Sequence, residues 1–112
     1  MAQVCFLSGI EIPKGKFSVE HYAPKSRIPK ELAQNPHNLY PAIKIINFVK
    51  GNLMPCEWHK VRYNKIYHAY KNWNIKSADR KILRQALNGM PDINPCDYCI
   101  CSIYKQHCVK ER

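Results

Sequence analysis

The fold of this chain is decided by residues 38–52, which read NLYPAIKIINFVKGN. The first three of these residues form a short extended piece. Pro41 suits the first position of a helix, where its missing N–H costs nothing. The apolar residues that follow recur at helical spacing, and Gly51 suits the C-terminal cap. The pattern therefore predicts a short helix over residues 42–50 with an extended entry.

The segments before this helix predict strands and a long loop. Residues 4–12 indicate a strand, a turn and a second extended piece. Residues 17–21 (FSVEH) alternate apolar and polar side chains, which predicts a strand with Phe17 and Val19 on the buried face. Residues 22–37 contain three prolines and have no periodicity. We expect them to form an irregular loop, and loops of this length are usually functional.

Two longer helices are expected after the short one. An apolar stripe that includes Trp58, Ile66 and Trp73 predicts a helix over residues 57–73. Residues 77–88 follow as another helix, with a serine as its N-cap and a glycine as its stop. The residues beyond this helix are rich in cysteine and irregular in pattern.

Strands early and helices late make the predicted fold class α+β. We expect a single compact domain with three parts: a core over residues 1–55, a helical extension over residues 56–90 and a cysteine-rich tail over residues 91–112. A chain of 112 residues can bury a small hydrophobic core. It contains neither a membrane-spanning apolar run nor a signal-peptide pattern, so we expect a cytoplasmic protein with no membrane partner.

The charge balance indicates an anionic partner. Eighteen Lys and Arg residues face eight Asp and Glu residues, which gives a net charge of +10. The basic residues are spread along the chain, which is typical of a basic face on a folded domain. Nucleic acid, an acidic protein and a membrane surface all fit this charge, and we favour nucleic acid. The alternative is a soluble domain that is merely basic.

Polar residues stand at the joints between the expected elements. Glu20 and His21 end the strand, Asn38 opens the extended piece, and Asn47 lies inside the short apolar helix. An Asn in the middle of a helix is unfavourable on propensity alone, and a buried one needs hydrogen-bond partners. Each residue alone could be structural, but their combination and order indicate a site.

These residues resemble the HNH endonuclease motif. The resemblance rests on residues 19–26 (VEHYAPKS) and 38–52, and it covers about residues 5–52. The family pattern is an acidic residue and His, a nearby Pro, then Asn-Leu, then a helix that ends in Asn-x-x-Lys-Gly. The resemblance implies a ββα-metal core, in which a short hairpin and a helix hold one divalent ion.

The resemblance also implies roles for single residues. Glu20 and Asn47 would bind the ion, which we expect to be Mg²⁺ or Mn²⁺. His21 would be the general base, and Asn38 would hold the loop and orient the histidine. Histidine can accept a proton near neutral pH, and carboxylate and amide oxygens suit a hard cation. The expected activity is metal-dependent hydrolysis of DNA phosphodiester bonds, with basic side chains contacting the DNA: Lys25 and Lys50.

The chain departs from the family pattern in two ways. Glu20 stands where the family usually has Asp, which changes the reach to the metal. Many HNH proteins also hold a structural zinc with two pairs of cysteines. Cys5 matches the first of these positions, but the other three are occupied by Ser8, Ile43 and Ile46. We therefore expect apolar packing where the family has zinc.

A second zinc site is a candidate in the tail. The spacing is Cys96-x2-Cys99-x-Cys101-x6-Cys108, which begins with the Cys-x2-Cys pair that is typical of zinc ligands. Free thiols explain the same residues equally well. The spacing therefore predicts a structural Zn²⁺ or a set of reduced cysteines.

Two other function classes compete with the nuclease. A nucleic-acid-binding or packaging accessory could keep the HNH-like fold without cleaving, and Glu20 in place of Asp favours this reading. A zinc-stabilised adaptor for protein partners would explain the tail but would give His21 and Asn47 no task. Small nucleases of this kind occur in phages, mobile elements and restriction systems. The sequence determines neither the DNA specificity nor the oligomeric state.

Overall fold

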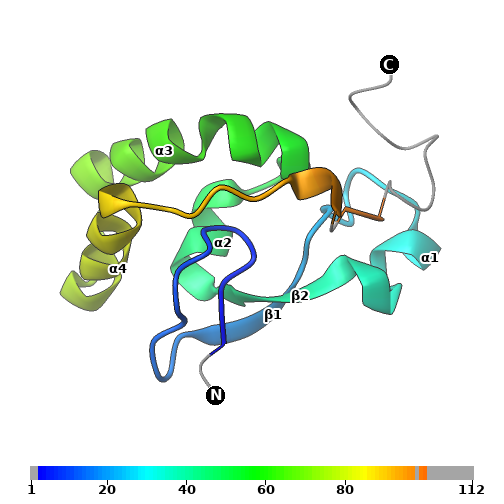
Figure 1. The fold of residues 1–112 in the computed structure, drawn as a ribbon, viewed down its shortest axis with the longest axis horizontal. Helices are drawn as coiled ribbons and strands as arrows, with labels where there is room; N and C mark the ends of the chain where they lie inside the picture. The colour runs from blue at the N-terminus through cyan, green and yellow to red at the C-terminus, as the bar shows by residue number, and fades with distance from the viewer. Residues whose placement is uncertain (1–2, 98, 101–112) are drawn as a thin grey trace.

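The computed structural model describes residues 3–97 and 99–100, and its elements are shown in Figure 1. It is a mixed fold of strands and helices, which confirms the α+β class. A two-stranded antiparallel sheet lies against a short helix, and two longer helices pack beyond that helix. The elements in chain order are β1 (Phe17–His21), α1 (Lys30–Ala33), η1 (Pro36–Asn38), β2 (Leu39–Ile43), α2 (Lys44–Lys50), α3 (Pro55–Asn72), α4 (Ser77–Asn88) and η2 (Pro95–Asp97).

The sheet is formed by β1 and β2, with Val19 opposite Pro41. The prediction that Pro41 begins a helix is therefore wrong, because the helix begins at Lys44. The carbonyl of Pro41 accepts a hydrogen bond of 3.1 Å from the amide of Phe6, so its backbone points away from β1. A proline at such a position removes no hydrogen bond from the ladder, which explains why a strand tolerates it.

The N-terminal segment is a tight loop and not the expected pair of strands. Its only ladder pairing among the described residues is a single bridge between Val4 and Glu11. The Cys5 amide donates to the Ile10 carbonyl at 2.9 Å, and the Gly9 amide donates to the Cys5 carbonyl at 2.7 Å. These local bonds close the loop on itself, so its backbone is satisfied without a second strand.

The alternation in β1 is present, but its phase is opposite to the prediction. Phe17 and Val19 are 45% and 56% exposed, whereas Ser18 and Glu20 are half-buried. A strand has a period of two, so one choice of register decides every side chain together. In β1 the polar side chains of Ser18 and Glu20 face the interior, so the Glu20 carboxylate is half-buried.

Residues 22–37 are more ordered than the irregular loop that we expected. They contain α1 and most of η1. A small hydrophobic cluster holds this segment against the start of α3 and the end of the described chain; its buried members are Ala23, Ile28, Leu32, Ala33, Met54, Cys99 and Ile100. The prolines therefore lie within a folded segment that contains short helices.

The two long helices lie close to their predicted bounds. α3 begins at Pro55, two residues earlier than expected, and α4 covers the predicted residues 77–88. Ser77 is not the N-cap, because Lys76 holds that position and makes no side-chain capping bond. No helix in the described ranges is long and apolar enough to cross a membrane.

One main core joins the sheet, α2 and the long helices. Cys5, Ile43, Ile46, Trp58 and Leu83 belong to the same buried cluster. The Trp58 indole N–H donates to the Leu7 carbonyl at 2.8 Å, which fixes the N-terminal loop on α3. The expected core and helical extension therefore share one hydrophobic interior.

The segment after α4 returns across α3 toward the 22–37 segment (Figure 1). The Met90 amide donates to the Tyr63 hydroxyl at 2.9 Å, and the Arg62 guanidinium donates to the Pro91 carbonyl at 3.1 Å. These bonds tether a segment without regular secondary structure. They carry the chain to η2, which contacts α3.

Candidate active site

The residues singled out in the sequence converge on one cavity of about 250 Å³. Glu20 and His21 come from the end of β1, while Asn47 and Lys50 come from α2. The full lining is Glu20, His21, Pro24, Lys25, Ser26, Asn47, Lys50, Gly51 and Asn52, and we call it the Glu20–His21 cavity. Of the residues predicted for the active site, Asn38 alone does not line it.

Glu20 and His21 both line this cavity, at the point where β1 ends. Neighbouring residues in a regular strand point to opposite faces, so two adjacent side chains can share a cavity only where the chain bends. The bend follows at residues 22 and 23, directly after His21. The sequence predicted this bend from the Tyr-Ala-Pro that follows the histidine.

Asn38 holds this bend from inside. Its side chain is fully buried, and its amide oxygen accepts from the Ala23 amide at 2.8 Å. Its amide nitrogen donates to the Ala23 carbonyl at 3.0 Å and to the Ala33 carbonyl at 3.2 Å. The Asn38 carbonyl also accepts from Tyr22 at 2.8 Å. Asn38 is therefore placed to position His21 and does not itself reach the cavity.

The two expected metal ligands contribute oxygen atoms to the same cavity. Glu20 is half-buried, and one of its carboxylate oxygens accepts a hydrogen bond from the Ser18 hydroxyl. Asn47 is also half-buried, and its side chain makes no hydrogen bond within the described part of the chain. A carboxylate and a free amide are a fitting donor pair for a hard divalent cation whose other ligands are water and phosphate.

His21 has an unsatisfied ring nitrogen. Its Nε2 atom is buried and has no hydrogen-bond partner among the described residues. Buried polar atoms are nearly always paired in folded proteins, and among the buried side-chain atoms of the described residues only His21 Nε2 and Arg62 Nη1 are not. An unpaired imidazole nitrogen can accept a proton from a molecule that reaches it.

Lys50 is an unusual lysine because its side chain is almost fully buried, with 1% exposure. Burial lowers the pKa of Lys50 from about 10.5 to about 8, because the charged form loses its hydration. Cys99, Glu20 and Glu57 oppose this effect, while the nearby charge of Arg27 adds to it. The sequence predicted Lys50 as a DNA contact but gave no sign that it is buried.

The cavity rim is held by an ion pair that the sequence did not reveal. Arg27 forms a salt bridge with Glu57 and also donates to the Asn52 carbonyl at 3.4 Å. Glu57 accepts from the Met54 amide at 2.8 Å, and the Arg27 bond followed by the Met54 bond lowers the pKa of its carboxyl. The pair ties the Lys25–Ser26 side of the rim to the start of α3. Glu57 is the third residue of α3, where a Glu side chain often accepts a bond from the backbone N–H that precedes the helix. This position is the sequence feature that could have indicated its role.

The positions where HNH proteins often hold zinc pack as expected. Cys5, Ser8, Ile43 and Ile46 are all fully buried. The Ile43 amide donates to the Cys5 sulfur at 3.4 Å, and the Ser8 hydroxyl accepts from the Ile10 amide at 3.4 Å. Apolar packing and two weak polar contacts therefore close this part of the core.

The tail cysteines are only partly within the described chain. Cys96 is half-buried and Cys99 is buried, whereas Cys101 and Cys108 lie outside the described residues. Within the described ranges, no three His, Cys, Asp or Glu side chains are grouped to hold a metal ion. The predicted tail zinc stays a prediction.

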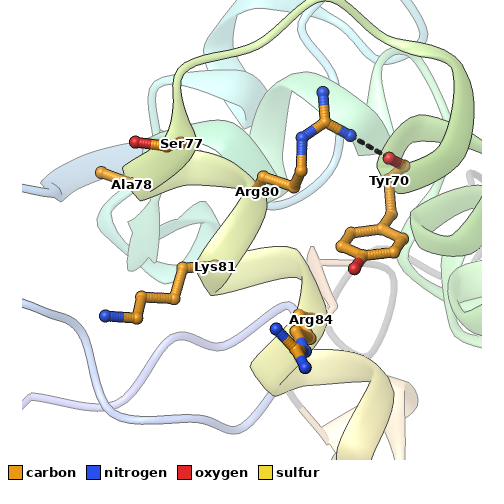
Figure 2. A pocket seen from close by; sticks show the side chains of 6 residues that line it. All are labelled: Tyr70, Ser77, Ala78, Arg80, Lys81 and Arg84. Atoms are coloured by element: carbon orange, nitrogen blue, oxygen red, sulfur yellow. Dashed lines mark hydrogen bonds between the residues drawn. The ribbon is translucent and has the colours of Figure 1, made fainter.

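A second basic cavity, of about 480 Å³, lies where α4 packs against the end of α3 (Figure 2). We call it the Tyr70–Arg80 cavity. The Arg80 guanidinium donates to the Tyr70 carbonyl, as Figure 2 shows, and to the Trp73 carbonyl at 2.9 Å. Arg80 therefore satisfies the last carbonyls of α3 and fastens the two helices together. Lys81 and Arg84 lie exposed at its edge.

Comparison with protein-family models, with curated proteins and with solved structures found no match to this chain. The geometry and chemistry of the Glu20–His21 cavity are therefore the basis for a function.

Proposed function

We propose that this protein is a metal-dependent endonuclease of HNH type that hydrolyses DNA phosphodiester bonds. The observation that carries the proposal is the convergence of Glu20, His21 and Asn47 on one cavity, with the Nε2 atom of His21 buried and unpaired. Glu20 and His21 come from β1 and Asn47 comes from α2, so the fold brings the histidine and the two oxygen donors together. The net charge of +10 suits a polyanionic substrate.

Each residue has a distinct task in this proposal. Glu20 and Asn47 hold a divalent cation through their side-chain oxygens. When bound, Mg²⁺ or Mn²⁺ stabilises negative charge on the phosphate and on the leaving oxygen. His21 accepts the proton of the attacking water at Nε2, while the water oxygen forms the new bond to phosphorus and the bond to the leaving oxygen breaks.

The remaining residues position the reacting groups. Asn38 fixes the bend after His21, so the imidazole keeps one orientation. Lys50 brings a positive charge into a poorly hydrated place, where its attraction to a phosphate is stronger than at the surface. Lys25 is exposed on the rim and contacts a phosphate of the DNA backbone outside the cavity.

The test compares the rates at which the wild type and His21→Ala nick a plasmid in the presence of Mg²⁺ or Mn²⁺. The variant should lose about 10²- to 10⁴-fold in rate, because general-base catalysis contributes on that order. His37→Ala is a matched control, since His37 is exposed and lies outside the cavity. Cleavage by His21→Ala at the wild-type rate would remove the histidine from the mechanism.

The second candidate is a nucleic-acid-binding accessory that does not cleave. Two observations favour it: Glu20 replaces the usual Asp, and one of its oxygens is already bonded to Ser18. In this case neither the wild type nor His21→Ala would nick DNA, and both would bind it with equal affinity. The nicking assay separates the two candidates, and electrophoretic mobility shifts on the same plasmid fragments show that the non-cleaving protein still binds DNA.

A further inference from the structure

α2, which carries Asn47 and Lys50 of the candidate active site, also carries an exposed aromatic side chain on another face. Phe48 follows Asn47 in α2 and is 73% exposed, more than any other large hydrophobic residue described. Such exposure costs free energy, because the ring would be more stable away from water. An exposed ring next to a metal ligand therefore needs an explanation.

Phe48 forms one wall of an apolar groove. Its ring meets the Trp73 ring edge to face, with 5.7 Å between the centroids and an interplanar angle of 87°. The groove has a volume of about 500 Å³ and is lined by Ile45, Phe48, Trp73, Asn74 and Ile75; we call it the aromatic groove. Arg80 fixes the backbone at Trp73 through the bond to its carbonyl, so the wall opposite Phe48 is held in place.

Positive charge flanks the aromatic groove. An adjoining cavity shares Ile45 and Phe48 with it and contains Lys16, Lys44 and Lys76. Its one carboxylate, Asp79, is paired with Lys16 at 3.2 Å. Lys44 and Lys76 are exposed, and Lys44 lies one helical turn before Phe48 on the same side of α2. The surface therefore offers flat apolar contact next to cations.

We propose that the aromatic groove binds an unstacked nucleobase, so that the substrate class is single-stranded or locally unpaired DNA. Aromatic rings stack on any base, and neighbouring lysines follow the phosphates of the same strand. Ile45 and Phe48 lie on a different face of α2 from Asn47 and Lys50, so several nucleotides of one strand would separate the stacked base from a phosphate in the Glu20–His21 cavity. In an intact duplex the bases are covered by their neighbours, which leaves Phe48 nothing to stack on.

This proposal rests on the proposed function, but its test does not need cleavage. Fluorescence anisotropy measures binding of labelled oligothymidylate and of a duplex in EDTA, with His21→Ala as the parent protein. Adding Phe48→Ala should weaken oligothymidylate binding about tenfold to a hundredfold, because loss of one stacked base has this effect. Duplex binding should not change, and Phe48→Trp should retain the single-strand affinity.

Tyr67→Ala is the matched control. Tyr67 is also an exposed aromatic residue, 54% exposed, with the Lys71 ammonium 5.8 Å from its ring centroid, but it lies on α3 outside the aromatic groove. Its loss should leave both affinities unchanged. If Tyr67→Ala and Phe48→Ala weakened oligothymidylate binding equally, the binding would be a nonspecific contribution of exposed aromatic rings, and the proposal would be overturned.

The remaining outcomes separate the groove from the nuclease. If no DNA is cut but Phe48→Ala still loses single-strand affinity, the groove proposal stands and the nuclease falls. If His21-dependent cleavage is present and Phe48→Ala binds oligothymidylate normally, the groove proposal falls alone. Light scattering measures the oligomeric state and tests a third possibility. If the wild type is a dimer and Phe48→Ala is a monomer, a second copy of the chain covers the groove. That result would overturn the proposal.

Discussion

The Tyr70–Arg80 cavity is larger than the Glu20–His21 cavity and carries more cations, yet its central group is already in use. Arg80 donates to two carbonyls at the end of α3, whereas His21 keeps a buried nitrogen unpaired and Lys50 is buried with a lowered pKa. Size and charge alone would favour the Tyr70–Arg80 cavity. Unsatisfied and poorly hydrated polar groups mark the place where a ligand completes the structure.

The largest effect should come from the burial of Lys50. The unfolded chain keeps the lysine proton up to about pH 10.5, while the folded protein releases it near pH 8. Between these values the unfolded state binds more protons, so the free energy of unfolding should rise with pH, by about 3 kcal/mol in total from this residue. Urea denaturation between pH 7 and 11 measures it, as the difference between the wild type and Lys50→Met.

Lys44→Met provides the control for that measurement. Lys44 lies on the same helix but is exposed, so its removal should leave the pH dependence of the wild type unchanged. Parallel stability curves for the wild type and Lys50→Met would mean that Lys50 is hydrated in the folded protein. The contrast between the two cavities would then be much weaker.

Arg80 should contribute to the free energy of unfolding, because its guanidinium is hydrogen-bonded within the protein. Arg80→Ala leaves the Tyr70 and Trp73 carbonyls without their donor, which should lower the free energy of unfolding by about 1–3 kcal/mol. Arg84→Ala removes an exposed charge from the same cavity and should change it by less than about 0.5 kcal/mol. Thermal denaturation of the two variants checks this, and equal stabilities would contradict the role given to Arg80.

The smallest effect concerns one exposed lysine at each cavity. Lys25→Ala should reduce the slope of log affinity for DNA against log salt by about 1, because one phosphate contact and its released counterion are lost. Lys81→Ala removes the same charge beside the Tyr70–Arg80 cavity and should leave the slope unchanged. Binding titrations at several salt concentrations measure both, and a reversed result would assign the DNA to α4.

The two halves of the chain differed in how well the sequence predicted them. α3 and α4 follow an apolar repeat that local spacing reveals, so their bounds were nearly correct. β1 and β2 are five residues each, and their inward face is chosen by distant partners. Phe17 and Val19 consequently face solvent. The strand tolerates Pro41 because the backbone at this residue points toward Phe6 and away from β1, so no hydrogen bond of the sheet is lost.

The candidate site was predicted by residue type and order, but not by environment. Glu20, His21 and Asn47 were found because their chemistry and spacing are distinctive, and the structure gathers them in one cavity. The burial of Lys50 and the Arg27–Glu57 pair depend on how the 22–37 segment packs on α3. No local pattern contains that information, since it arises from contacts between residues far apart in the chain.

The packing of Cys99 and Ile100 has a consequence for the timing of synthesis. Both are buried in the cluster that holds Ala23 and Leu32, and this cluster supports the segment that carries Pro24 to Ser26 on the cavity wall. Every residue that lines the cavity leaves the ribosome before these two. A nascent chain thus displays Glu20, His21 and Asn47 while the support behind the 22–37 segment is incomplete. The packing behind the 22–37 segment is therefore complete only once residues 99–100 have also emerged.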